Sequence, residues 1–159
     1  MIQKLTLRTL KQTNDLILST FKGLDKYEKK NLIASLFPNR FKEVYQKNEI
    51  KEMEYFVYLV DDKVVGVVGL YREVEDYEDE CWLGWFCVDK RYRNQKIGKK
   101  LFEYALNLAT QRNQKTIYIY TYNTKMYQKA ISLYKKYGFK EIKVKSKYKR
   151  DLYFKKGLK

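Results

Sequence analysis

Two runs near the middle of the chain, Glu54–Val60 and Lys63–Tyr71, are rich in β-branched and aromatic residues. This composition predicts two strands, and Asp61 and Asp62 between them predict a tight hairpin turn. A third run, Trp82–Val88, carries apolar residues on both faces. It therefore predicts an interior strand that is covered on both sides.

Two later segments show the spacing of amphipathic helices. The first is centred on Leu101 and Phe102, and the second contains Tyr134 and ends at Gly138, a common C-terminal stop. A strand is predicted between them over Thr116–Tyr122. Two terminal strands are predicted near residues 140–146 and 150–156.

The first third of the chain predicts one strand followed by three helices. The expected elements are a strand over residues 3–9, a helix capped by Thr13 and ended by Gly23, a helix that begins at Asp25, with Glu28 completing a capping box, and stops before Pro38, and a short helix over Asn39–Tyr45. No linker or repeat divides the sequence, so residues 1–159 are expected to form one α/β domain, a mixed sheet with helices on its faces.

The composition excludes several kinds of catalytic site. The chain has 159 residues and no histidine, which removes a Ser-His-Asp triad, a Cys-His pair and a histidine zinc site. Cys81 and Cys87 are six residues apart in a run predicted to be extended, which places them on the same face and roughly 20 Å apart at about 3.3 Å per residue. That separation is too great for a disulfide, and a reducing cytoplasm fits.

The sequence also lacks an apolar segment of the length that membranes require. Its N-terminus has no stretch typical of a signal peptide, and the longest run of low polarity, Val64–Tyr71, is far shorter than a membrane span. We therefore expect a soluble, cytoplasmic protein without a membrane partner and without a bound metal.

The charge is large and unevenly distributed. The chain has 34 Lys and Arg against 19 Asp and Glu, a formal net charge of +15. Residues 135–159 hold eleven cations and two acids, whereas residues 73–80 hold six acids and no cation. The overall charge favours anionic partners such as nucleic acid, a membrane surface or a polyphosphorylated cofactor, while the acidic segment favours a cationic one.

The segment from Val88 to Leu101 has the clearest chemical content. Here a predicted strand leads through a cationic loop into a helix, whose first amides have no intrahelical partner. Such a helix start binds phosphate, and Gly98 allows close approach of a ligand to the backbone. Four cations surround it: Arg91, Arg93, Lys96 and Lys99.

The order and spacing of three segments resemble the GNAT superfamily of acyl-CoA-dependent N-acyltransferases. These segments are the hairpin Val60–Gly66, the strand and loop Leu83–Gly98, and the helix end Ala130–Phe139. The resemblance implies a central, mostly antiparallel sheet of about seven strands with one splayed pair, flanked by about four helices.

The resemblance also implies acetyl-CoA as cofactor. The family holds the CoA diphosphate on the amides of a loop that starts with Arg or Gln and contains two glycines; Arg93 and Gly98 match, but Lys96 stands at the first glycine. Pantetheine would lie between the splayed strands, and Tyr127 replaces a frequent asparagine near it. The implied cofactor-binding residues are Phe86, Cys87, Val88, Arg93, Asn94, Gln95, Lys96, Ile97, Gly98, Lys99, Asn123 and Tyr127.

For catalysis, the resemblance assigns Tyr134 as the general acid that protonates the departing thiolate. Many relatives carry a glutamate in the strand where this chain has no carboxylate from Trp82 to Val88. We name Glu80 as the candidate base acting through water, with Glu73 and Glu78 as alternatives that also attract a cationic acceptor. Three aromatic residues are expected to shape the acceptor pocket: Trp82, Trp85 and Tyr120.

These observations predict an N-acetyltransferase that moves an acetyl group from acetyl-CoA directly to a primary amine. The acceptor is a small polyamine-like molecule, an aminoglycoside, or a peptide or protein amine, and a homodimer is left open. One alternative is a non-catalytic, acyl-CoA-binding domain, and another is a basic nucleic-acid or ribosome-associated protein. For the cationic excess we favour a Lys-rich composition over a nucleic-acid function.

Overall fold

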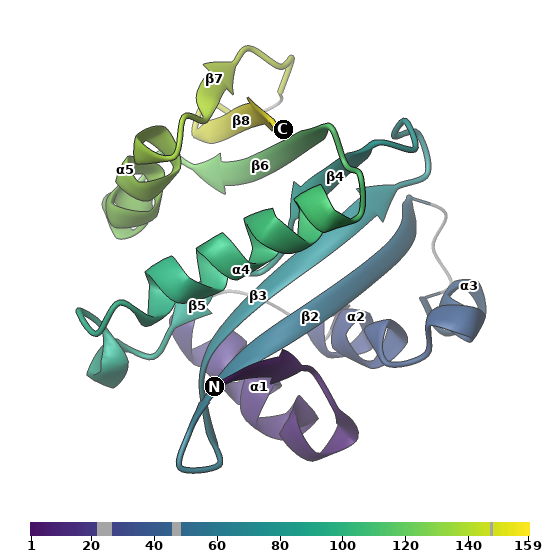
Figure 1. Cartoon of the computed structure of the whole chain (residues 1–159), viewed down its shortest axis with the longest axis vertical. Coiled ribbons are helices and arrows are strands. Elements are labelled where there is room, and N and C mark those ends of the chain that lie inside the picture. Colours follow the sequence, from purple (N-terminus) through teal and green to yellow (C-terminus); the bar gives the residue numbers. More distant parts are fainter. Residues whose placement is uncertain (22–26, 46–48, 147) are drawn as a thin grey trace.

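The computed structural model describes residues 1–21, 27–45, 49–146 and 148–159. Eight strands form one sheet in the order β1-β2-β3-β4-β6-β8-β7, with β5 paired to β3; the β4–β6 pairing is parallel and the others are antiparallel (Figure 1). The strands are β1 (Ile2–Lys4), β2 (Ile50–Val60), β3 (Lys63–Glu73), β4 (Glu80–Leu83), β5 (Cys87–Val88), β6 (Thr116–Tyr122), β7 (Lys140–Ile142) and β8 (Asp151–Gly157).

Helices cover both faces of this sheet, which confirms the predicted α/β fold class. One buried core joins α1–α3 to β2 and β3, and a second joins α4 and α5 to the opposite face (Figure 1). Across the described residues, no helix has both the length and the apolar content needed to cross a membrane. The helices are α1 (Leu7–Thr20), α2 (Tyr27–Ser35), α3 (Phe41–Tyr45), α4 (Ile97–Gln111) and α5 (Gln128–Lys136), with 3-10 turns η1 (Pro38–Arg40), η2 (Lys90–Tyr92) and η3 (Lys125–Tyr127).

The N-terminal boundary differs from the prediction. The expected strand over residues 3–9 ends at Lys4, and α1 begins at Leu7 with Thr6 as its N-cap, so the proposed cap at Thr13 was wrong. Thr6 N donates to Thr9 Oγ1 at 3.0 Å, which closes the first turn earlier than the sequence indicated. The predicted helix end at Gly23, the start at Asp25 and the side chain of Glu28 lie outside the described residues.

The central hairpin and the short helix before it are confirmed. Asp61 and Asp62 have φ values of 48° and 58°, and they connect Val60 to its partner Lys63. Two left-handed residues in sequence form the turn that matches the twist of a two-residue hairpin. The expected helix over Asn39–Tyr45 corresponds to η1 and α3.

The predicted strand Trp82–Val88 is divided into β4 and β5 by a bend at Gly84. Gly84 N donates to Gly69 O at 2.7 Å, and a Cβ on Gly84 would lie 3.1 Å from the Gly69 backbone. The two chains approach this closely because neither residue has a side chain. The bend therefore depends on this pair of glycines.

The expectation that the two cysteines share one face of a strand was wrong because of this bend. Cys81 belongs to the core beneath α4, whereas Cys87 belongs to the core beneath α1, so they do not share a face. Strand alternation is lost across the bend, which explains the error. Both thiols are free and buried, and burial raises the pKa of each to about 12. Neither thiol is an activated nucleophile.

The bend produces the expected separation of two strands. The last β4–β6 pair is Trp82 with Tyr118, and β6 then continues to Tyr122 beside β8, while β5 remains with β3. Asp89 N donates to Val65 O at 2.9 Å, so the backbone groups of Val88 point away from β3. A gap thus opens between β5 and β6.

Candidate active site

A pocket of about 400 Å³ lies at this separation of the strands. The segment Leu83–Phe86 forms one wall, and Ile119–Tyr122 of β6 forms the other. Tyr134 of α5 also lines the pocket, and so does Tyr71 from the face covered by α1–α3. The pocket therefore passes through the sheet and connects its two faces.

Tyr134 has an apolar environment. It is 5% exposed, and its ring lies 5.5 Å from the Phe102 ring and 6.5 Å from the Phe86 ring, centroid to centroid. Burial raises the pKa of its phenol above the ordinary value, and Tyr127 adds to this effect. Among the residues that the structure describes, the Tyr134 hydroxyl has no hydrogen-bond partner. The phenol is therefore protonated at neutral pH and able to donate a proton.

The cationic loop before α4 contains two residues in the left-handed conformation, and neither of them is glycine. Asn94 and Lys96 have φ values of 66° and 60°, and Lys96 is the N-cap residue of α4. The first i→i−4 bond runs from Lys100 N to Lys96 O at 3.0 Å. The amides of Ile97, Gly98 and Lys99 precede this bond, and they are the helix-start donors that an anion would use.

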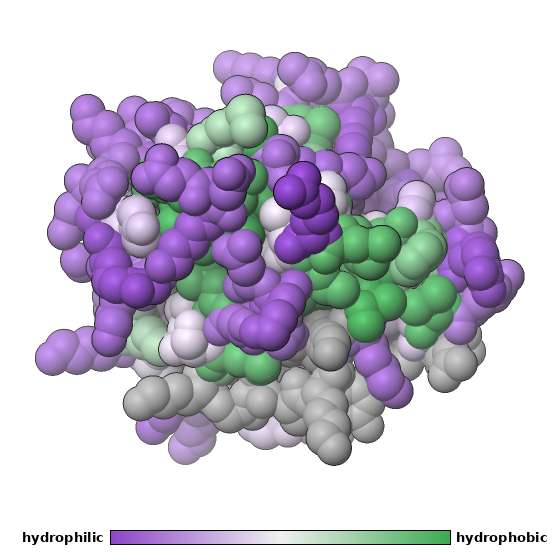
Figure 2. Space-filling view, turned by 90° about the horizontal axis from the view of Figure 1, so that it is seen from below, coloured by the Kyte–Doolittle hydropathy of each residue, from purple (hydrophilic) through white to green (hydrophobic). Residues whose placement is uncertain are grey.

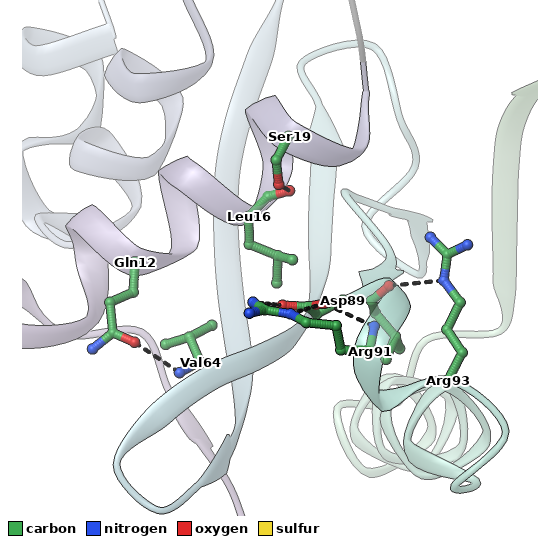
Figure 3. Close-up of polar contacts among 8 residues, drawn as sticks. Gln12, Leu16, Ser19, Val64, Asp89, Arg91 and Arg93 are labelled. Carbon is green, nitrogen blue, oxygen red and sulfur yellow. Dashed lines mark hydrogen bonds and ion pairs between the residues drawn. The ribbon is translucent and has the colours of Figure 1, made fainter.

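Two arginines of this loop have different roles (Figure 3). Arg91 forms an ion pair with Asp89 at 2.6 Å, and the hydrogen bond from Arg91 lowers the pKa of Asp89 to about 2. Arg93 donates from Nε to Val88 O at 3.1 Å, and its side chain points away from this ion pair. Arg91 is thus neutralised by its neighbour, whereas Arg93 keeps its charge beside the start of α4.

The Phe86 ring connects the loop to the pocket. Phe86 lines the pocket, and a Cβ added to Gly98 would lie 3.7 Å from Phe86 Cζ and 3.6 Å from Val88 Cγ2. The helix start and the gap between β5 and β6 are therefore neighbouring parts of one site. A ligand that reached from the loop amides into the pocket would pass along Val88 and Phe86.

The other predicted cofactor residues differ in burial and in whether they line the pocket. The side chains of Cys87 and Ile97 are buried in the two cores, whereas Gln95 is exposed. Tyr127 lines the pocket and stacks on Phe21, another lining residue, with their ring centroids 6.0 Å apart. Asn123 is exposed and lies outside the lining; its N donates to Arg150 O at 2.7 Å.

Of the three predicted glutamates, Glu73 lines the pocket, and Glu78 and Glu80 do not. Glu73 is partly buried, and burial raises its pKa, as do nearby carboxylates led by Asp76. Glu80 instead accepts a hydrogen bond from Tyr118 Oη at 2.8 Å at the far end of β4. Glu73 is therefore the one of these three glutamates that lines the pocket.

Two of the three predicted aromatic residues line the pocket, and one does not. Trp85 and Tyr120 line the pocket, whereas Trp82 does not. Trp82 stacks between Tyr71 and Tyr118, with ring centroids 6.0 and 4.9 Å away. Its ring therefore lies beside the pocket on the open part of the sheet.

The sequence analysis missed several aromatic residues that line the pocket. Tyr71 precedes Glu73 by two positions on β3, so strand alternation could have placed the two on one face. The others come from separate helices and strands, and no local pattern connects them. They are Phe21, Tyr45, Tyr55 and Tyr122.

Comparisons with known proteins agree with this geometry. The family model for the acetyltransferase (GNAT) domain matches residues 51–141, and the chain therefore belongs to the GNAT family. The probable N-acetyltransferase camello of Xenopus laevis is 36% identical over 87 residues, which are 55% of this chain and 38% of that protein. The chain thus matches well under half the length of this curated relative.

Solved structures share the fold over almost the whole chain. An acetyltransferase of the GNAT family from Staphylococcus aureus Mu50 has a TM-score of 0.76 at 24% identity, covering 100% of this chain and 99% of that one. An aminoglycoside 6'-N-acetyltransferase complexed with coenzyme A has a TM-score of 0.74 at 17% identity, covering 99% and 97%. At these identities the likeness establishes the fold.

Proposed function

We propose that this chain is an acetyl-CoA-dependent N-acetyltransferase that acts on a primary amine by direct transfer. The observation that carries the proposal is the continuous site from the amides of Ile97–Lys99, past Phe86, to the Tyr134 side chain in the pocket. A thioester cofactor with a diphosphate at one end and an acyl group at the other matches such a site.

The residues of the loop fit the cofactor's diphosphate. Helix-start amides and the charge of Arg93 favour an anion, and the left-handed conformation of Lys96 turns the chain into the helix. Val88 N–H points into the gap and would bind the pantetheine arm, whereas Val88 O accepts from Arg93. When bound, acetyl-CoA supplies an acetyl group activated as a thioester.

Two side chains handle the protons of the proposed reaction. Glu73 accepts a proton from the acceptor, because an amine with a pKa near 10 is protonated at neutral pH and must lose a proton before it attacks. Tyr134 donates its phenolic proton to the sulfur as the carbon–sulfur bond breaks. An acetamide and a free thiol result. The attacking nitrogen releases its second proton to solvent, Glu73 also returns its proton to solvent, and Tyr134 recovers its own from there.

We also propose a cytoplasmic location, which fits the two free thiols. The homodimer, the role of Glu80 as a base acting through water, and the role of Glu78 in attracting a cationic acceptor stay predictions. A protein that bound acyl-CoA without turnover would be the non-catalytic alternative.

Thiol release from acetyl-CoA tests the proposal. The protein is mixed with acetyl-CoA and, separately, with simple alkylamines, polyamines, aminoglycosides and peptides, and free CoA is measured with a thiol reagent. We expect amine-dependent release, with mass spectrometry detecting the acetylated amine. CoA binding without release for any amine would contradict an enzymatic role.

A further inference from the structure

Aromatic rings form a row on the open part of the sheet, on the face that α1–α3 cover elsewhere. Trp82 stacks on Tyr71 and Tyr118, Tyr120 stacks on Tyr153 at 5.0 Å, and Trp82 meets Tyr153 edge-on at 6.5 Å. Apart from Tyr71, none of these rings belongs to either core of the described residues. We call these five residues the aromatic platform.

Carboxylates surround the aromatic platform and fix its rings. Each of three rings donates its polar hydrogen to a separate carboxylate, which keeps further lone pairs for a cation. Tyr71 and Tyr118 cover the two faces of Trp82, so an ammonium group would contact the carboxylates at the rim of the platform. The three bonds are Trp82 Nε1 to Asp76 Oδ1 at 3.2 Å, Tyr118 Oη to Glu80 Oε1 at 2.8 Å and Tyr120 Oη to Asp151 Oδ1 at 3.1 Å.

The aromatic platform is continuous with the pocket. Tyr71 and Tyr120 belong to both, and Glu73 lies in the lining beside Tyr71. Among the described residues that line the pocket, Glu73 is the charged one, and neither Lys nor Arg contributes. Because Lys and Arg make up 34 of the 159 residues, this local charge is opposite to that of the molecule. The charge of the pocket lining therefore favours a cationic ligand.

We infer that the acceptor is a linear aliphatic polyamine. One terminal amine enters the pocket beside Glu73, and a second ammonium group lies on the aromatic platform among Asp76, Glu80 and Asp151. This inference rests on the proposed acetyl transfer and names its substrate class.

The chemistry of the aromatic platform favours a polyamine over a peptide or an aminoglycoside. Peptide amides and sugar hydroxyls need hydrogen-bond partners when they leave water. Here the polar hydrogens of Trp82, Tyr118 and Tyr120 are already used, and the backbones of β4, β6 and β8 pair with one another. A polyamine presents only methylenes, which pack against aromatic side chains, and ammonium groups, which pair with carboxylates. Lys155, opposite Tyr118 on β8, limits the platform at the end away from the pocket.

The test compares spermidine, a linear triamine, with butylamine, which has one terminal amine and no second charge. At saturating acetyl-CoA, we expect kcat/KM for spermidine to exceed that for butylamine by about tenfold or more. The double variant Asp76→Asn/Asp151→Asn should bring this ratio close to one. The matched control is Asp79→Asn, in the same acidic segment, because Asp79 pairs with Lys115 at 2.9 Å outside the platform. It should retain the ratio.

Calorimetry with the same two amines separates this inference from the proposed function. If no amine releases thiol, the proposed function fails, but tighter binding of spermidine than of butylamine, by about tenfold, still supports the polyamine site. Equal kcat/KM and equal affinity for the two amines would overturn it. A higher kcat/KM for kanamycin or for a lysine peptide than for spermidine would also overturn it.

Discussion

The Tyr134 side chain combines an apolar environment with a position in the lining of the pocket. Its phenol is a weaker acid than an alkyl thiol, so its contribution is a hydrogen bond and a proton to sulfur. We expect Tyr134→Phe to lower kcat by roughly 10- to 1,000-fold in the thiol-release assay, with little change in the affinity for acetyl-CoA.

Tyr137→Phe is the control for this prediction. Tyr137 follows α5 and donates to Glu103 Oε1 at 2.6 Å, away from the pocket. It should retain kcat. If Tyr134→Phe also retained kcat, the hydroxyl of Tyr134 would have no part in the reaction.

Glu73 has a raised pKa, first because it is partly buried and then because Asp76 and other carboxylates are close. If ionised Glu73 takes the proton of a bound ammonium group, kcat/KM is level near neutral pH and falls as pH drops through the pKa of Glu73. The Glu73→Gln variant has no carboxylate at this position to take that proton, so it can react only with the small fraction of the amine that is already unprotonated. Its kcat/KM should therefore be lower and should increase about tenfold per pH unit up to the pKa of the amine.

Glu52→Gln provides the comparison, because Glu52 pairs with Arg72 at 3.2 Å outside the pocket lining. Its pH profile should match that of the unmodified protein. A level profile for Glu73→Gln as well would show that another group accepts the proton.

Lys96 shows how a departure from the family pattern is accommodated. The sequence could predict the loop and its cations, but not that a lysine would take the left-handed conformation at φ 60°. Because a side chain disfavours this conformation, we expect Lys96→Gly to raise the free energy of unfolding by about 0.5–1 kcal/mol in urea titrations. Lys99→Gly, inside the first helical turn, should lower it by about 0.5–1 kcal/mol. Equal effects of the two changes would contradict this account.

At the scale of elements, the bend between β4 and β5 is the feature that opens the site. The sequence predicted the β2–β3 hairpin, β6, α4 and α5 because each has a local pattern, but it misplaced the end of the first strand and the start of α1. It could not predict the break at Gly84, because the contact with Gly69 joins residues of different strands. Sequence proximity likewise did not reveal that β4 directs Glu80, the predicted base, to Tyr118; its role in catalysis stays a prediction.

The bend itself can be tested with a single methyl group. An added Cβ on Gly84 would lie 3.1 Å from the Gly69 backbone, which cannot move aside as a flexible side chain can. We expect Gly84→Ala to lower the free energy of unfolding by about 1–3 kcal/mol and to lower kcat/KM. Gly157→Ala, where no atom lies within 4 Å of the added Cβ, should have no such effect. Equal stability of both variants would contradict the proposed close packing.

Across the whole molecule, the net charge is positive, whereas the pocket and the aromatic platform carry negative charges. Figure 2 shows hydrophilic side chains over much of the surface seen from below, and the chain carries a net charge of +15. A positive field would attract a polyanionic cofactor toward the proposed site at the start of α4. The pocket and the aromatic platform carry carboxylates instead, which suits a cationic acceptor. The composition indicated an anionic ligand and the acidic segment 73–80 a cationic one, and both stay predictions.

We propose that acetyl-CoA binds along one path from the start of α4 to the pocket. Titration of acetyl-CoA into ¹⁵N-labelled protein, followed by backbone amide shifts, tests this claim directly. We predict the largest shifts at Val88 and at residues 94–99, with smaller shifts at Tyr134. Saturable shifts confined to other parts of the sheet, or no shifts at all, would contradict the account.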